Sequence, residues 1–380
     1  MGITGWDRIK AACALEKTDR VAICPALYRS AAGALQGMTQ AETQLNPEKA
    51  LDAMLKTYDD FGGWDALYTS LPDTETMWLF YYRSPIRWKL AGRELPEDYQ
   101  AQVFETEALS YDEYDRIIEE GFDKFFDEEY IFRITDWTPE EKEKKIAEQN
   151  LVIERAATEW QKRGVQDFFG SGRAHPFFNL SIMRSLEKFT EDLYFKPDKV
   201  EQAIKKMTDE MIPRVIQECK DYGVNYFSLN ELRASTYFYP LEIFERFWMP
   251  YTLQIVDALW SEGIVTNLLV QTNWDKNLPY FKHFPKGAVC LGLDGSTNIF
   301  EAKKLLDGWC SFHGDVPPQM VALEKPETVA NYTKKLIDEV GYNGGLILNI
   351  GCEMPPDTKP ENFRAFLETG KNYEASKRQI

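Results

Sequence analysis

The stretch Gln271-Thr-Asn-Trp274 stands directly after a β-like apolar run, and Phe312-His-Gly-Asp-Val-Pro317 and Asn349-Ile-Gly-Cys352 occupy the same kind of place. In a (β/α)8 barrel the active site is built from the loops that follow the carboxyl ends of the strands. Polar residues that recur at such places therefore predict a barrel enzyme whose site is shared among several loops.

Working outward from this part of the chain, apolar runs alternate with helical stretches, which is the pattern of a parallel sheet. Helices are expected at residues 5–16, 47–61, 139–163, 186–194, 197–222 and 240–262. The predicted fold class is α/β, a (β/α)8 TIM barrel. About eight strand candidates are found, at residues 21–25, 64–68, 173–178, 225–231, 264–270, 289–293, 309–312 and 346–350.

One domain accounts for the chain. A length of 380 residues is within the range of α/β barrels that carry insertions. Residues 73–162 interrupt the regular alternation with acidic helical stretches and with a segment rich in Pro, Arg and Trp. We therefore expect a single barrel domain at residues 1–375 with a mainly helical insertion at about residues 73–162.

Charge and composition restrict the classes of partner. The formal net charge of −17 disfavours nucleic acid and anionic membrane surfaces, because both would repel the protein. No apolar run is long enough to span a membrane, and the amino-terminal stretch lacks the features of an export signal. The six cysteines form no CxxC pair, which fits reduced thiols. We expect a cytoplasmic protein with a small-molecule substrate.

Acidic residues near different strand ends are candidates for acid–base catalysis. Asp65, Glu231 and Asp294 stand at such places, as does His175, and any of them would be held next to a substrate by the barrel. Each has an alternative structural role, as a helix N-cap for the acids or as a buried imidazole for His175. Asp315, which precedes Val-Pro-Pro, has the strongest N-cap character.

Four further residues are candidates for substrate binding. Gln271 and Asn273 leave the same face of an extended segment, where they can either hydrogen-bond a polar substrate or cap a loop. Trp274 lies beyond the strand end and is the best candidate for an aromatic pocket wall, although most aromatic residues in this region are expected to fill the core. His313 ends a strand and can act as a ligand or a proton donor.

Cys352 is the candidate metal ligand. It follows an apolar run and a glycine, so its thiol is expected to face the barrel mouth, where a thiolate can bind zinc or remain inert packing. The three histidines do not form an obvious three-histidine site, because His283 falls in a connection away from the mouth.

At these residues the chain resembles the uroporphyrinogen decarboxylase superfamily, and within it the cobamide-dependent methyltransferases. The resemblance covers most of the chain, and the block from Gly344 to Cys352 is its most specific part. Matching segments also occur at Trp6-Asp-Arg-Ile-Lys-Ala-Ala, Glu16-Lys-Thr-Asp-Arg-Val-Ala, Gly314-Asp-Val-Pro-Pro and Glu361-Asn-Phe-Arg-Ala. Asp65 is similar in position to the central aspartate of the decarboxylases.

Two departures from the decarboxylases remove charge that would handle the carboxylates of a porphyrinogen. Arg29-Ser-Ala-Ala-Gly-Ala stands where they carry R-Q-A-G-R, and Asn349-Ile-Gly-Cys352 stands where they carry N-L-G-H. The terminal Gly-Cys instead resembles the corrinoid methyltransferases, in which this cysteine and an H-x-C pair bind zinc. Here Gln271-Thr-Asn273 occupies the H-x-C position, so the resemblance leaves open whether zinc is a cofactor.

The resemblance implies the first methyltransferase of an O-demethylase system. Such an enzyme moves a methyl group from a small methylated substrate, here most simply an aryl methyl ether, to the Co(I) of a separate corrinoid protein, which carries the cobalamin. One alternative is a decarboxylase or lyase of the same superfamily that acts on a small carboxylated or aromatic substrate. A second is a paralogue that docks corrinoid proteins without catalysis.

Overall fold

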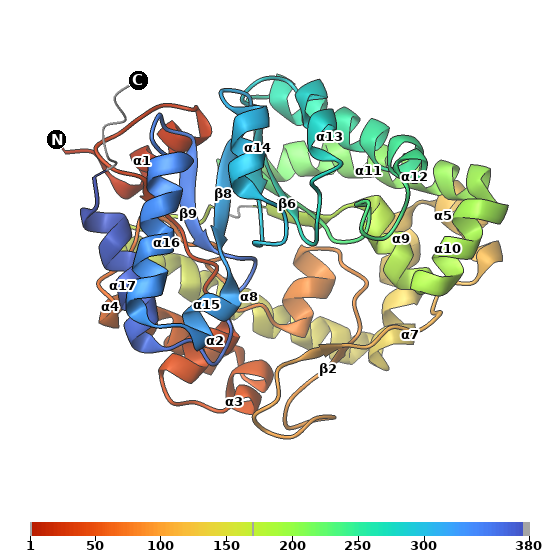
Figure 1. The fold of residues 1–380 in the computed structure, drawn as a ribbon. Coiled ribbons are helices and arrows are strands. Elements are labelled where there is room, and N and C mark those ends of the chain that lie inside the picture. The colour runs from red at the N-terminus through yellow and green to blue at the C-terminus, as the bar shows by residue number, and fades with distance from the viewer. Residues whose placement is uncertain (1, 169–170, 375–380) are drawn as a thin grey trace.

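The structure, a computed structural model, describes residues 2–168 and 171–374 (Figure 1). The predicted domain bounds, residues 1 and 375, lie outside the described residues. Within them, seven parallel strands form one sheet in the order β1-β9-β8-β7-β6-β5-β4. The strands are β1 (Ala22–Ile23), β4 (Ser171–Ala174), β5 (Tyr226–Glu231), β6 (Val265–Val270), β7 (Val289–Gly292), β8 (Ser311–Val316) and β9 (Leu346–Ile350).

The second predicted strand, residues 64–68, joins the two edges of this sheet without becoming a regular strand. Asp65 N–H donates to the Ile23 carbonyl of β1 (3.0 Å), and Leu67 forms a parallel bridge with Asp167, shortly before β4. Leu67 N–H donates to the Gln166 carbonyl, and Phe168 N–H donates to the Leu67 carbonyl, both at 2.8 Å. The barrel therefore closes through backbone hydrogen bonds, and the predicted α/β barrel class is confirmed.

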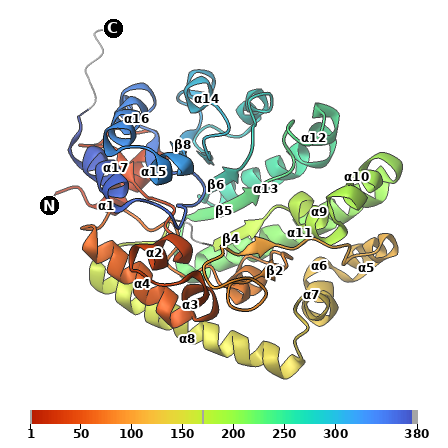
Figure 2. The ribbon, with the colours of Figure 1, turned by 60° about the horizontal axis from the view of Figure 1, so that its bottom comes forward.

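An outer layer of helices packs around the strands, as both ribbon views show (Figures 1 and 2). α11, the longest of them, ends at Gly223, whose positive φ of 64° is the left-handed conformation that glycine adopts readily. The helices are α1 (Gly5–Cys13), α2 (Arg29–Leu35), α3 (Gln40–Leu45), α4 (Pro47–Asp60), α9 (Pro176–Arg184), α10 (Leu186–Phe195), α11 (Pro197–Tyr222), α12 (Leu241–Phe247), α13 (Met249–Ser261), α14 (Ile299–Leu306), α15 (Pro318–Leu323), α16 (Pro326–Glu339) and α17 (Pro360–Asn372), with a 3₁₀ turn at Leu278–His283.

Several element boundaries differ from the sequence expectation. The strand expected at 309–312 is β8 at Ser311–Val316, so His313 lies within the strand and not at its end. The strand expected at 173–178 ends at Ala174, because Pro176 starts α9 and His175 caps that helix by accepting the Phe177 N–H at its Nδ1 (3.1 Å). The single helix expected at 240–262 is two helices, α12 and α13, which meet at Trp248. Pro250 stands in the first turn of α13, where its missing N–H costs no helical hydrogen bond.

The segment predicted as an insertion contains a two-stranded hairpin and short helices, followed by the long α8. α8 runs beside α4 (Figure 2), and Arg155 of α8 pairs with Glu48 and Asp52 of α4. Arg214 of α11 pairs with Asp123 of the insertion (2.6 Å). The elements are a π-helical turn at Met77–Tyr81, β2 (Trp88–Lys89), β3 (Gln102–Val103), a 3₁₀ turn at Tyr111–Glu113, α5 (Tyr114–Glu120), α6 (Phe122–Phe125), a π-helical turn at Phe126–Tyr130, α7 (Ile131–Thr135) and α8 (Pro139–Arg163).

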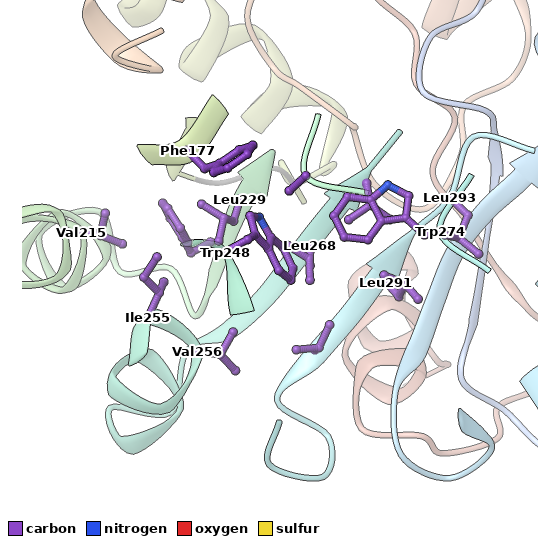
Figure 3. Packing of buried hydrophobic residues seen from close by; sticks show 14 of the residues in the cluster. Phe177, Val215, Leu229, Trp248, Ile255, Val256, Leu268, Trp274, Leu291 and Leu293 are labelled. Atoms are coloured by element: carbon purple, nitrogen blue, oxygen red, sulfur yellow. The ribbon is translucent and has the colours of Figure 1, made fainter. Parts of the chain in front are cut away.

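The largest apolar cluster lies between the sheet and the helices. Figure 3 shows part of it, including Trp248, Trp274 and the aliphatic side chain of Leu268. The two indole rings are 5.1 Å apart between centroids and tilted by 59°. Such aromatic pairs bury large apolar areas and stabilise the packing of α12 and α13 on the sheet.

Throughout the part of the chain that the structure describes, no helix has both the length and the apolar composition that crossing a membrane requires.

Candidate active site

A cavity of about 360 Å³ lies at the carboxyl ends of the strands. This is the place where the loops of an α/β barrel converge, and the volume suits a small molecule. Its polar lining comes largely from residues at the ends of β5 to β9 and the loops after them, namely Asn230, Gln271, Asp294, His313, Asn349, Cys352 and Glu353. Its aromatic walls are Tyr28, Tyr68, Trp78, Trp88 and Phe178.

Four of the residues predicted for the site line this cavity, namely Gln271, Asp294, His313 and Cys352. Gln271, Asp294 and Cys352 follow the ends of β6, β7 and β9, as the strand-end rule anticipates, whereas His313 lies within β8. Their chemical roles stay predictions. The hydrogen bonds and the burial of each side chain restrict the roles that it can take.

His313 on β8 is fully buried and neutral. Its Nε2 lies 3.0 Å from the Cys24 carbonyl oxygen, and its ring stacks on Tyr68 with centroids 5.4 Å apart. Burial lowers the pKa of His313 to about 4, because the charged imidazolium is poorly solvated there. His313 is therefore a poor proton donor at neutral pH and a good fixed hydrogen-bonding group.

Asp294 uses both carboxylate oxygens to hold loop backbone. Oδ2 accepts the Thr272 N–H (3.0 Å) and Oδ1 accepts the Ser296 N–H (2.9 Å). Asp294 therefore shapes the loops after β6 and β7 and presents negative charge at the cavity edge.

The lining at Cys352 does not fit the zinc site that its position suggests. Burial raises the pKa of the Cys352 thiol to about 12, so the thiolate that binds metal is disfavoured without a neighbouring cation. Among residues 2–168 and 171–374 no group of three or more His, Cys, Asp or Glu side chains is placed to hold a metal ion. Gln271, which lines the same cavity as Cys352, has a carboxamide side chain, and a carboxamide is a poor zinc ligand.

Glu231 and His175, two of the predicted catalytic residues, are buried side by side and do not line the cavity. Glu231 Oε1 accepts hydrogen bonds from the backbone N–H groups of Leu232 (2.9 Å), Arg233 (2.7 Å) and Ala234 (3.2 Å). This side chain therefore stabilises the conformation of the loop after β5. Burial raises the pKa of Glu231 to about 7. Burial also lowers the pKa of His175 to about 3, so the 3.5 Å approach of the two side chains is not an ion pair at neutral pH.

Asp65 also lies outside the cavity lining. Its carboxylate pairs with Arg20 (2.6 Å) and Arg8 (3.2 Å) and accepts the Ile23 N–H (2.9 Å), beside the start of β1. The structure thus places Asp65 beside the start of β1, and its catalytic role stays a prediction that this position does not favour. A carboxylate held by two guanidinium groups and a backbone amide fixes the amino-terminal helix to the barrel.

Asn273 and Trp274 likewise do not line the cavity, in contrast to their predicted binding roles. Asn273 is half-buried and donates to Asp275 Oδ2 (2.7 Å) and the Ser296 carbonyl (3.0 Å), which is a loop-capping arrangement. Trp274 is fully buried in the aromatic cluster of Figure 3, and its Nε1–H donates to the Gln271 carbonyl (2.6 Å). Trp274 therefore anchors the backbone that presents the Gln271 side chain.

Sequence reasoning missed a charged group in the cavity lining, formed by Arg29, Asp73 and Glu353. Arg29, at the start of α2, pairs with Asp73 through Nη1 and Oδ2 (3.0 Å), and both line the cavity with Glu353. Burial and the nearby Asp73 carboxylate raise the pKa of Glu353, so this acid retains its proton more readily than an exposed glutamate. The available signal was the position of Glu353 directly after Cys352 at a strand end.

The insertion supplies another part of the lining that the sequence did not reveal. Trp78, Ile86, Trp88 and Val103 reach the cavity from the π-helical turn and the hairpin. The density of Trp and Arg in this segment was the only signal, since no spacing rule places a distant hairpin over a barrel. Residues 78–103 therefore help to enclose the substrate space.

The charges of the lining do not favour a polycarboxylate. Arg29 and Arg233 face three acids, Asp73, Asp294 and Glu353, and the Arg233 guanidinium is paired with Glu105. Because Arg29 is also ion-paired, the cavity has little positive charge to offer a substrate with many carboxylates. A small neutral molecule with an aromatic ring suits this combination of charge and aromatic walls.

Among solved structures, a methyltransferase from Methanosarcina mazei resembles the whole chain. The TM-score is 0.70, and the match covers 97% of this chain and 98% of that chain at 18% sequence identity. At this identity the likeness supports the barrel fold.

Curated relatives match shorter segments. A uroporphyrinogen decarboxylase from Alcanivorax borkumensis is 27% identical over 133 residues, which is 33% of this chain and 36% of the relative. One from Chloroherpeton thalassium is 24% identical over 197 residues, 50% of this chain and 54% of the relative. The chain thus matches between about a third and a half of the length of these proteins.

A family model described as uroporphyrinogen decarboxylase (URO-D) matches residues 167–373, more than half of the chain. This segment runs from the residues before β4 to the end of α17 and includes six of the seven strands of the sheet, with the cavity residues Asp294, His313 and Cys352. The protein is therefore a member of the uroporphyrinogen decarboxylase family.

Proposed function

We propose that this protein transfers a methyl group from a small methylated aromatic molecule, of which an aryl methyl ether is the simplest, to the Co(I) of a separate corrinoid protein. The observation that carries the proposal is the aromatic-walled cavity of about 360 Å³, whose two arginines are both ion-paired. This lining suits a neutral ring better than a polycarboxylated porphyrinogen. The likeness of the fold to a methyltransferase supports the same reaction class.

The chemistry requires positioning and a proton. Co(I) attacks the methyl carbon, the carbon–oxygen bond breaks, and its electron pair stays on the phenolic oxygen. Phenolate is a modest leaving group, so proton donation to this oxygen lowers the barrier. Glu353 is the cavity acid with a raised pKa and is the proposed donor, while the aromatic walls orient the methyl group.

Zinc has no part in this proposal, because the donor set around Cys352 does not fit it. A resident Lewis acid would polarise the ether oxygen, and here the protonated Glu353 side chain takes that place. The corrinoid enters as the methyl acceptor on its own protein.

A second candidate is a decarboxylase or lyase that acts on a small aromatic carboxylate. One observation favours it: Arg29 Nε is buried in the cavity region and lacks a hydrogen-bond partner among the residues that the structure describes. That N–H can donate a hydrogen bond to one carboxylate oxygen of a ligand. The curated relatives are decarboxylases by name, which is consistent with this reading.

Product analysis separates the two candidates. The enzyme is incubated with methoxylated aromatics, methoxylated aromatic acids, methylamines and methyl thioethers, with and without a reduced corrinoid protein. The proposal predicts demethylated product only when the corrinoid protein is present. Release of CO₂ from an aromatic acid without corrinoid would instead establish the lyase, and partner binding without any product would indicate a non-catalytic paralogue.

A further inference from the structure

The loop that joins β2 and β3, residues 90–101, borders the cavity on one side and solvent on the other, and we call it the strap. Gln100 and Ala101 of the strap line the cavity. Residues 92–100 are exposed apart from the half-buried Leu95. In Figure 1 the hairpin lies at the bottom of the view, near α3. A displacement of the strap would therefore open the cavity to solvent and expose little additional apolar surface.

Gln44 of α3 connects the two arms of the strap through one buried carboxamide. Its Oε1 accepts a hydrogen bond from the Ala91 N–H (2.7 Å), and its Nε2 donates to the Tyr99 carbonyl oxygen (3.0 Å). Ala91 lies near the first end of the strap and Tyr99 near the other, so the same side chain holds both arms against α3. A carboxamide combines a donor and an acceptor without charge, which suits a buried bridge of this kind.

Contacts nearer the surface also reach the strap. The Ala41 N–H, at the start of α3, donates to the Glu97 carbonyl oxygen (2.8 Å). Arg93 pairs with Glu75 (3.0 Å), but the Arg93 side chain is 40% exposed, and an ion pair at the surface contributes little to stability. The buried bridge through Gln44 is therefore the contact on which the position of the strap most depends.

α3 also connects the strap to the wall of the cavity. Gln40, one turn before Gln44, donates from Nε2 to the Ser30 carbonyl oxygen (3.1 Å), and Ser30 lines the cavity. α3 thus fixes the strap relative to the residues that surround a ligand. Gln44 itself lies outside the lining, so its effect on a ligand must pass through the strap.

We propose that Gln44 is a positioning residue that holds the strap closed over the cavity, and that ligands enter and leave when its two hydrogen bonds break and the strap moves away. This inference rests on the proposed function only in taking the cavity as the substrate site. Both hydrogen bonds are lost on opening, so they set the balance between the closed and the open strap. The open strap is a minor state that governs access to the cavity.

Cys352 provides a probe of access that needs no ligand. It is half-buried and lines the cavity, and the other five cysteines are buried. The rate of its modification by N-ethylmaleimide is measured by mass spectrometry in the wild type and in Gln44→Met, which replaces the carboxamide by an apolar group of similar length. The loss of two hydrogen bonds should speed the modification about tenfold or more. An unchanged or slower rate would overturn the proposal.

Gln36→Met is the matched control. Gln36 also bridges two groups, since its Nε2 donates to Thr57 Oγ1 (3.1 Å) and to Asp60 Oδ2 (3.2 Å), and neither group belongs to the strap. In this variant Cys352 should react at the wild-type rate. Equal acceleration in both variants would show that a general loosening of the fold exposes the thiol, and it would contradict the role of Gln44.

Hydrogen exchange tests the same opening in the unaltered protein. The Ala91 N–H is bound to Gln44, so its exchange requires the strap to open. Exchange at Ala91 and modification of Cys352 should therefore rise by the same factor as low concentrations of urea are added. Different urea dependences of the two rates would overturn the proposal, because the thiol would then be reached by another route.

Ligand exchange separates this inference from the proposed function. With 4-fluoroanisole as a ¹⁹F NMR probe, Gln44→Met should accelerate entry and exit by the same factor, so that the dissociation constant stays nearly unchanged. Weaker binding without faster exchange would contradict the strap. Failure of this aryl ether to bind, or of its methyl group to reach Co(I), would count against the proposed function, while the Cys352 and Ala91 measurements still decide the role of Gln44. Methyl transfer by an enzyme whose Gln44→Met variant keeps the wild-type rate of Cys352 modification would leave the function and remove the strap.

Discussion

Replacing Glu231 by Gln should stabilise the protein, and the gain should grow with pH. Glu231 is fully buried, and burial raises its pKa from 4.5 to about 7. Gln keeps the Oε1 atom that accepts three backbone N–H groups, and its amide faces His175 Nδ1, where Glu231 Oε2 lies 3.5 Å away. The substitution thus removes the ionisable group and preserves its contacts.

The direction in which wild-type stability changes with pH follows from the raised pKa of Glu231. Below the unfolded-state pKa both states hold the proton, and the wild type carries no penalty. As pH rises towards 7, the unfolded chain ionises while the folded protein resists, so wild-type stability falls. A shift from 4.5 to about 7 corresponds to about 3 kcal/mol in total, of which about 2.5 kcal/mol appears between about pH 5 and about pH 8.

Urea unfolding of both proteins across this pH range measures the difference directly. His175 and the surface groups titrate in both proteins, so subtracting one curve from the other isolates Glu231. At about pH 8 the variant should melt about 4 °C higher, given an unfolding entropy of about 0.8 kcal/mol/K for a chain of this length. A stability difference that does not change with pH, or a variant that is less stable at about pH 8, would refute the reasoning.

Three further outcomes are expected. Glu353→Gln should lower kcat for methyl transfer by roughly 100-fold or more, because the proton donor is removed. Ligand binding measured by calorimetry should be nearly unchanged, and a wild-type kcat would contradict the role of Glu353. Asp65→Asn should lower the free energy of unfolding measured in urea by about 3–5 kcal/mol, because Arg8 and Arg20 lose a buried carboxylate partner. The activity per folded molecule should persist, and an unchanged stability would contradict the ion-pair assignment. Dialysis against a metal chelator should leave activity unchanged; loss of activity that zinc restores would show a metal site.

Chain topology explains why part of the site could be predicted. In a parallel barrel every strand ends at the same rim, so a polar residue directly after an apolar run is placed there by connectivity alone. Gln271, Asp294 and Cys352 reach the cavity for this reason, whereas His313 lines it from within β8. The same regularity predicted the fold class, even though the second strand is reduced to a single bridge at Leu67.

A place near the end of a strand does not by itself put a side chain on the cavity side of the barrel. Glu231 was predicted for the site, but its neighbour Asn230 lines the cavity, because successive residues of β5 point to opposite faces. Asp65 was misplaced for a different reason. Its partners Arg8 and Arg20 come from separate parts of the chain, and only the assembled structure brings their charges together.

Long-range packing supplied what the sequence could not. Trp78 and Trp88 belong to a segment that reads as an interruption of the barrel, and nothing in their spacing indicates that they reach the cavity. For Trp274 the sequence suggested the reverse, because its place after a strand predicted a pocket wall. Its large apolar ring is instead buried against Trp248, where it stabilises the core packing.

The central claim is tested most directly by following a ¹³C-labelled methyl group from a methoxyphenol. The enzyme is mixed with the donor and a stoichiometric Co(I) corrinoid protein, and the corrinoid is analysed by absorbance and NMR. The account predicts conversion to methyl-Co(III) that carries the label, at a rate that depends on the enzyme and is lost in Glu353→Gln. A corrinoid protein of proven competence that stays Co(I) with every methylated donor would contradict the account.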